Sequence, residues 1–99
     1  MSEILIGDFL KLNNSDIQVI DVREQYEYEN GHIDSIHIPM SEVFQSIKTI
    51  KSNKKVIIYC QTGRRAAAVV YMLQKNYNLN NVFNLIGGYD AYINFNTKT

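Results

Sequence analysis

The chain of 99 residues is 45% hydrophobic and 20% charged, a composition typical of a folded globular protein rather than a disordered one. Ten basic and ten acidic side chains cancel, which argues against a nucleic-acid binder that relies on a basic surface. No apolar stretch approaches the roughly 20 residues of a membrane span, and Glu3 stands where a signal peptide carries positive charge. We therefore predict one domain over residues 1–99, cytoplasmic, with neither nucleic acid nor membrane as a partner.

The elements expected from hydrophobic periodicity alternate between helices and strands. In chain order they are a helix at 8–12, a strand at 17–20, a helix at 41–50, a strand at 55–59, a helix at 64–76 and a strand at 81–85. Gly7 and Ser41 are the expected N-caps of the first two helices. The strand at 55–59 is apolar on both faces, which predicts a central position in a parallel sheet. This alternation is typical of an α/β fold around a mostly parallel sheet.

Cys60, the only cysteine, directly follows the predicted central strand. In α/β sheets, ligands bind beyond the carboxyl ends of the strands, so this position is a candidate site. A single thiol forms no disulfide within the chain, which agrees with a reducing compartment. It also leaves no second thiol to resolve a modified Cys60, so any sulfur chemistry must end on a partner.

The segment Cys60-Gln61-Thr62-Gly63-Arg64-Arg65 joins this strand to the helix at 64–76. Backbone N–H groups of such a loop turn inward and the helix N-terminus adds partial positive charge, so the loop is expected to favour a thiolate on Cys60. Gly63 can adopt the unusual backbone angles that the loop requires. A cysteine that ends an apolar strand is more often a small buried hydrophobe. However, two arginines at a helix N-terminus oppose the helix dipole, and an anionic ligand would explain them.

Three segments resemble signatures of the rhodanese-like family. Residues 19–24 (VIDVRE), followed by Glu27-Tyr28 and Gly31-His32-Ile33, resemble the first signature. Residues 60–65 have the form Cys-x-x-Gly-x-Arg of the family's active-site loop, and residues 84–89 (NLIGGY) resemble its C-terminal signature. The resemblance implies a rhodanese-like α/β fold, with a mainly parallel sheet of about five strands flanked by helices on both faces.

The resemblance also implies a sulfurtransferase that carries sulfane sulfur as a persulfide on the catalytic residue Cys60. The implied substrate-binding residues are Gln61, Thr62, Gly63, Arg64 and Arg65, and Arg65 is expected to matter more than Arg64. The expected partners are a small-molecule donor, thiosulfate or a persulfide, and a thiol, protein or cyanide acceptor, in a ping-pong mechanism. No cofactor is expected. No metal is expected either, since His32, His37 and Cys60 are too few ligands for a closed zinc site.

Several other residues are given structural interpretations. Asp21 is expected to hold loop backbone groups, and Arg23 to pair with Glu24 or Glu27, because sulfur transfer onto a thiolate needs no dedicated general acid. Gly87-Gly88 predicts a tight turn into a last helix, and the resemblance to the family implies that this turn forms one wall of the site. Two departures from the family pattern are a turn at Asp34-Ser35 that is one residue short and Tyr92 in place of a common tryptophan.

Two other functions are weighed against sulfur transfer. Phosphatases and arsenate reductases with related loops place five residues between cysteine and arginine, whereas four separate Cys60 from Arg65 and position 66 is alanine. The shorter loop is expected to fit one sulfur atom better than a phosphoryl group. A non-catalytic sulfur-carrier or regulatory module is the other alternative, but inactive family members typically lose the cysteine.

Overall fold

Five parallel strands form one sheet in the computed structural model, which describes residues 2–97. The order across the sheet is β1-β5-β4-β2-β3, so the apolar strand β4 lies at the centre, as predicted. The strand bounds are Glu3–Ile4 for β1, Ile17–Asp21 for β2, Ile36–His37 for β3, Lys55–Tyr59 for β4 and Val82–Leu85 for β5.

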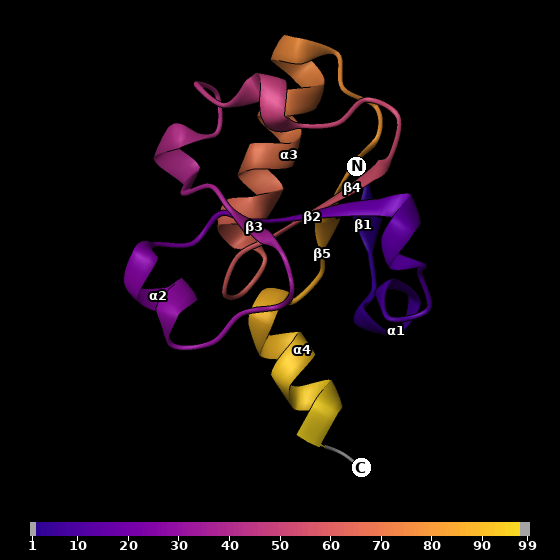
Figure 1. Cartoon of the computed structure of the whole chain (residues 1–99), viewed down its shortest axis with the longest axis vertical. Helices are drawn as coiled ribbons and strands as arrows, with labels where there is room; N and C mark the ends of the chain where they lie inside the picture. The colour runs from indigo at the N-terminus through magenta and orange to yellow at the C-terminus, as the bar shows by residue number, and fades with distance from the viewer. Residues whose placement is uncertain (1, 98–99) are drawn as a thin grey trace.

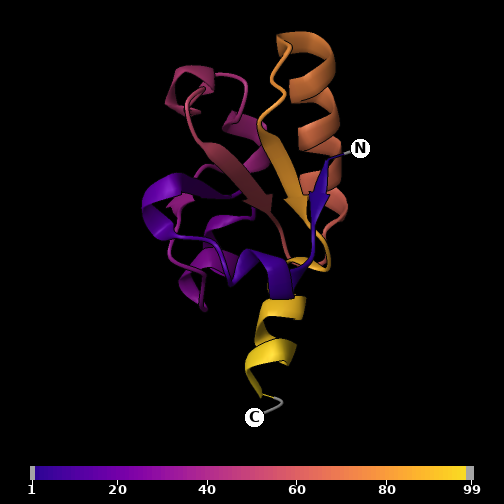
Figure 2. The ribbon, with the colours of Figure 1, turned by 90° about the vertical axis from the view of Figure 1, so that its right-hand side faces the viewer.

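Over the residues that the structure describes, four α-helices and three short 3₁₀ helices connect and cover these strands (Figure 1). The α-helices are α1 (Ile6–Phe9), α2 (Gln25–Glu29), α3 (Arg64–Tyr77) and α4 (Gly88–Thr97). The 3₁₀ helices are η1 (Asn14–Asp16), η2 (Met40–Glu42) and η3 (Ile47–Thr49). Figure 2 shows β4 and β5 pointing towards the start of α4, which extends away from the sheet. Within residues 2–97, no helix is both long and apolar enough to cross a membrane.

The two faces of the sheet carry separate apolar clusters because successive strand residues point to opposite sides. On β4, Val56 and Ile58 belong to one cluster, whereas Ile57 and Tyr59 belong to the other. The first cluster includes the buried side of α3, formed as predicted by Ala66, Val69, Val70 and Leu73. The second includes Phe9 of α1 and packs against the tyrosines of α4. Helices therefore lie on both faces, and both clusters hold β4 in place.

Two of the predicted helices are wrong in extent or type. The segment 41–50 forms η2 and η3 instead of one α-helix, and Pro39 rather than Ser41 precedes η2. Val43 and Ile50 are buried against the α3 face, and the Gln18 side chain bonds the carbonyl oxygen of Thr49 and the N–H of Lys51. These tertiary contacts outweigh the weak helical preference of a ten-residue segment.

The first helix begins earlier and ends earlier than predicted. It spans Ile6–Phe9 with Leu5 as N-cap, so Gly7 lies inside the helix rather than at its cap. It ends because the N–H groups of Lys11 and Leu12 bond carbonyl oxygens only three residues back, the tighter 3₁₀ pattern that closes many helices.

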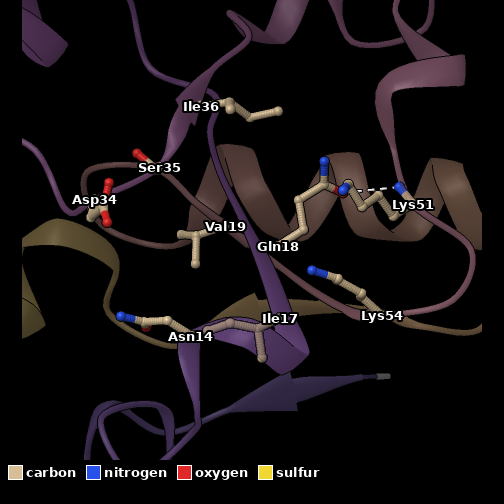
Figure 3. Close-up of a pocket in the computed structure, with 9 residues that line it drawn as sticks. All are labelled: Asn14, Ile17, Gln18, Val19, Asp34, Ser35, Ile36, Lys51 and Lys54. Carbon is tan, nitrogen blue, oxygen red and sulfur yellow. Dashed lines mark hydrogen bonds between the residues drawn. The ribbon is translucent and has the colours of Figure 1, made fainter.

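A shallow groove of about 310 Å³ lies beside β2, where β3 pairs only with Ile20 and Asp21 (Figure 3). Val19 lines the groove between Asp34 and Ser35 on one side and Lys51 and Lys54 on the other. No residue of the 60–65 loop lines it. This groove is therefore separate from the candidate site.

Candidate active site

Cys60 follows the last residue of β4, at the carboxyl edge of the sheet, and is 1% exposed. Its sulfur accepts hydrogen bonds from the N–H of Gly63 at 3.1 Å and the N–H of Ala66 at 3.3 Å. Both groups belong to the start of α3, where the first N–H groups have no partner within the helix. Two amide dipoles and a helix N-terminus therefore converge on this sulfur and stabilise negative charge on it.

The backbone of Gly63 determines how these two N–H groups are placed around the sulfur. It is the N-cap of α3 with φ of 101°, a conformation that side chains disfavour, and a Cβ there would lie 3.2 Å from the nitrogen of Gly87. Glycine at this position therefore lets the backbone turn the N–H groups of Gly63 and Ala66 towards Cys60 without strain.

The N-terminus of α4 holds the other side of the loop. The N–H of Tyr89 bonds the carbonyl oxygen of Cys60 at 2.8 Å, and the N–H of Asp90 bonds that of Gln61 at 3.0 Å. Gly88 has φ of 58°, and a Cβ there would overlap the carbonyl oxygen of Cys60. The carbonyl oxygens of Cys60 and Gln61 are thus bonded to α4, while the N–H groups of Gly63 and Ala66 face the sulfur. The Gly87-Gly88 turn lies directly against the site.

Arg23, which is 2% exposed, connects the end of β2 to the same loop. Its guanidinium bonds Asp21 at 2.8 Å, the carbonyl oxygen of Gly31 at 2.7 Å and the side-chain oxygen of Gln61 at 2.9 Å. The guanidinium also lies 4.4 Å from the ring centre of Tyr89. Burial disfavours its charge, but the hydrogen bond and charge of Asp21 raise the pKa of Arg23 overall.

The expected partners of Arg23 were wrong. Arg23 pairs with Asp21 rather than with Glu24 or Glu27, because Asp21 at the buried end of β2 is the carboxylate within reach. The expected backbone role of Asp21 is confirmed, since its carboxylate also accepts the N–H of Arg23 at 2.9 Å.

Glu27 pairs instead with Arg65 on α3. The two nitrogens of the Arg65 guanidinium donate to the two carboxylate oxygens of Glu27 at 2.8 and 2.9 Å. This hydrogen bonding is the main reason why the pKa of Glu27 falls to about 2, against an opposing effect of burial. The same bond is the main reason why the pKa of Arg65 is raised. By contrast, Arg64 is exposed, and no carboxylate within residues 2–97 pairs with it.

The fold should lose stability in acid through this pair. A carboxyl whose pKa is about 2 in the folded chain and 4.5 ordinarily contributes stability above about pH 4.5 and loses it as the pH falls towards 2. Because the pair is partly exposed and solvent screens it, we expect Glu27→Gln to remove about 1–2 kcal/mol of this pH dependence between pH 6 and pH 3. Urea unfolding at several pH values from 6 to 3 measures it, with Glu29→Gln on the same helix as control. Equal pH dependence in wild type and Glu27→Gln would contradict the prediction.

Residues 8–95 match the family described as rhodanese-like domain. The chain belongs to the rhodanese-like family. It is 40% identical over 76 residues to the Bacillus subtilis protein YqhL, covering 76% of this chain and 60% of that protein. It is 31% identical over 78 residues to the thiosulfate sulfurtransferase GlpE of Coxiella burnetii, covering 78% and 72% respectively.

A crystal structure of a rhodanese-related protein from Thermoplasma volcanium has the same fold as this rhodanese-like chain. The TM-score is 0.86 at 32% identity, with 96% of this chain and 93% of the other covered. The fold predicted from the three signatures is therefore confirmed, and a relative of the chain is named as a sulfurtransferase.

Both departures from the family pattern are accommodated by tyrosines. Tyr92 stacks on Tyr89 with ring centres 5.9 Å apart, and Tyr89 in turn covers Arg23. In the turn that precedes β3, Ser35 donates to the carbonyl oxygen of Ile33 at 2.6 Å, and the Tyr59 hydroxyl accepts the N–H of Ile33 at 3.0 Å. The shortened turn is thus bonded to the central strand.

Residues Cys60–Arg65 lie at the carboxyl edge of the sheet, where the sequence predicts the site. Sequence reasoning missed the N–H of Ala66 and the carboxylate of Glu27. It expected the Gly87-Gly88 turn beside the site, but not the hydrogen bonds from the N–H groups of Tyr89 and Asp90. His32 and His37 instead stack on either side of the Tyr28 ring, and each donates one ring N–H to a backbone carbonyl oxygen. Within residues 2–97, no group of three potential metal ligands occurs.

Proposed function

We propose that this chain is a sulfurtransferase that accepts a sulfane sulfur on Cys60 and passes it to a thiol or to cyanide. The observation that carries the proposal is the pair of amide hydrogen bonds to Sγ, from Gly63 and Ala66, at the start of α3. Such a site stabilises a thiolate, and the thiolate is the nucleophilic form of cysteine. Gln61, Thr62, Gly63, Arg64 and Arg65 form the substrate-binding loop in this proposal.

The first half-reaction transfers one sulfur atom from the donor. With thiosulfate, the Cys60 thiolate attacks the outer sulfur, the bond between the two donor sulfurs breaks, and sulfite leaves with the electron pair. The product is a Cys60 persulfide anion, and the total charge of three negative units is unchanged. Sulfite leaves as a dianion and needs no proton, so this step requires no general acid.

The second half-reaction restores the enzyme. A cyanide ion attacks the outer sulfur of the persulfide and leaves as thiocyanate, while the electron pair of the broken S–S bond returns to Cys60. A thiolate acceptor leaves as a persulfide by the same route. Because the donor product departs before the acceptor reacts, the kinetics are expected to be ping-pong.

The carboxylates near the loop support sulfur transfer over phosphate hydrolysis. Efficient hydrolysis of a phosphate ester uses an acid to protonate the leaving group. Glu27 has a pKa of about 2 and is bonded to Arg65, so it is ionised at neutral pH. Asp21 is bonded to Arg23, and Asp90 accepts a hydrogen bond from the side chain of Gln61. All three carboxylates near the loop thus act as hydrogen-bond acceptors and not as acids, whereas sulfur transfer needs no acid.

The two arginines receive different roles from those expected from the sequence. The guanidinium of Arg65 is bonded to Glu27, whereas Arg64 is exposed. Arg64, rather than Arg65, is therefore the main side-chain charge that binds an anionic donor in this proposal. Arg65 remains part of the loop and holds it to α2 through Glu27.

Intact-protein mass spectrometry after thiosulfate treatment tests the proposal. We expect the mass to increase by one sulfur atom, and a reducing thiol or cyanide to remove the increase. The same preparation is assayed for thiocyanate formation and for hydrolysis of an aryl phosphate. Faster phosphate hydrolysis than sulfur transfer would favour the phosphatase, whereas an adduct that no acceptor removes would favour a non-catalytic role.

A further inference from the structure

Apart from Cys60 itself, the formal charges of the side chains around its loop sum to zero. Three arginines belong to the loop or bond it, namely Arg23, Arg64 and Arg65. Three carboxylates balance them: Asp21 pairs with Arg23, Glu27 pairs with Arg65, and Asp90 accepts a hydrogen bond from the Gln61 side chain at 2.6 Å. The attraction for an anion therefore comes from backbone amides and from the exposed Arg64, not from a net positive cluster.

Glu27 is the carboxylate that neutralises the arginine of the family motif. Both of its oxygens bond Arg65, and one of them also accepts the N–H of Glu24 at 2.9 Å at the start of α2. This second bond ties the carboxylate to the start of α2. Cys60 is among the groups whose charge raises the pKa of Arg65, after the larger effect of the Glu27 hydrogen bond. The positive charge of Arg65, which Glu27 neutralises, therefore also interacts with the sulfur of Cys60.

We propose that Glu27 sets the donor preference of the site, so that it selects donors with a single negative charge, such as persulfides, over the dianion thiosulfate. This inference rests on the sulfurtransferase function proposed above. A persulfide donor transfers its outer sulfur to the Cys60 thiolate and leaves as a thiolate, with two negative charges before and after the step. Such a donor needs less positive charge in the site than thiosulfate does, and the neutral surroundings of the loop fit it.

The test compares two donors that differ in charge, thiosulfate and the monoanion methanethiosulfonate, in wild type and Glu27→Gln. A glutamine can still accept the N–H of Glu24, so the change removes mainly the negative charge. The freed charge of Arg65 should lower KM for thiosulfate about tenfold at low ionic strength, but KM for methanethiosulfonate only about threefold, because Coulomb energy scales with donor charge. Most of the gain should disappear at about 0.5 M salt. A purely structural role would not produce this dependence on donor charge.

Two further variants control the experiment. Glu29→Gln removes the same formal charge from the same helix, but Glu29 bonds Gln25 rather than an arginine, so neither KM should change. Adding Arg65→Gln to Glu27→Gln removes the freed charge, so the ratio of the two KM values should return to that of wild type. Thermal unfolding of each variant confirms that it is folded under the assay conditions.

Equal effects on both donors in Glu27→Gln, or no effect on either, would overturn the proposal and leave the ion pair with a structural role alone. The proposed function would survive that result, because it depends on sulfur transfer through Cys60 in the wild type. Conversely, a wild type that transfers no sulfur from either donor would reject the proposed function itself.

Discussion

Replacing Cys60 by serine should abolish both the sulfur adduct and the formation of thiocyanate. Cys60 is the only thiol in the chain, so no other side chain can form a persulfide. A serine hydroxyl ionises far less readily than a thiol and is a weak nucleophile unless a base activates it. No carboxylate between residues 2 and 97 supplies such a base: Asp21 and Glu27 are bonded to arginines, Asp90 is bonded to the side chain of Gln61, and the hydrogen bonds to Cys60 Sγ come from backbone N–H groups. Intact-protein mass spectrometry and a thiocyanate assay on the same sample measure the two losses.

The fold should survive this change. Sγ accepts the N–H groups of Gly63 and Ala66, and a serine oxygen at the same position can accept them as well. We expect the free energy of unfolding to change by no more than about 1–2 kcal/mol. An unfolding curve of Cys60→Ser then separates lost chemistry from lost structure. Thiocyanate formation at the wild-type rate by a folded Cys60→Ser protein would refute the role of Cys60.

Long or continuous features of the fold could be predicted from the sequence. The bounds of β4 and the buried side of α3 follow from apolar patterns that extend over 5 and 14 residues respectively. The strands β1 and β3 have 2 residues each, too few to show a period, and exist because they pair with β5 and β2. The segment 41–50 has apolar residues at helical spacing, but its contacts with α3 and Gln18 determine its form.

The site was predictable as far as it is continuous in sequence. Residues 60–65 carry the proposed nucleophile, the glycine turn and two of the three arginines in one segment. The charge balance of that segment was not predictable, because Glu27 and Arg65 are 38 positions apart and only the fold brings them together. Sequence reasoning paired Arg23 with Glu24 or Glu27, whereas the buried end of β2 presents Asp21, two positions away, to Arg23. Which carboxylate an arginine meets at the carboxyl edge of the sheet therefore depends on where the fold directs each side chain, because one of these pairs is local and the other spans 38 positions.

Two helix N-termini act on the loop in complementary ways. The first turn of α3 donates N–H groups to the sulfur of Cys60, and the first turn of α4 donates N–H groups to the carbonyl oxygens of Cys60 and Gln61. The second set holds the peptide groups in the orientation that the first set requires. Orientation of the loop should therefore depend on α4, although α4 supplies no group to the sulfur.

Replacing Gly88 by alanine should disable the site without removing any functional group. The new Cβ would overlap the carbonyl oxygen of Cys60 and lie 2.9 Å from the carbonyl carbon and oxygen of Gln61. The backbone at Gly88 also has φ of 58°, which costs an alanine about 1–2 kcal/mol. The loop must move away from α4, and a displacement of about 1 Å at a reactive group can lower the rate about 100-fold.

We therefore expect Gly88→Ala to reduce kcat/KM for thiosulfate about 100-fold and the free energy of unfolding by about 2 kcal/mol or more. The matched control is Gly7→Ala in α1, where a Cβ meets nothing within 4 Å and φ is not positive. This control should keep wild-type activity and gain about 0.5–1 kcal/mol, since alanine favours the helix. Activity is measured below the unfolding transition of each variant, with the sulfur adduct as a second readout. A stable Gly88→Ala protein with wild-type kcat/KM would show that contact with α4 does not orient the loop.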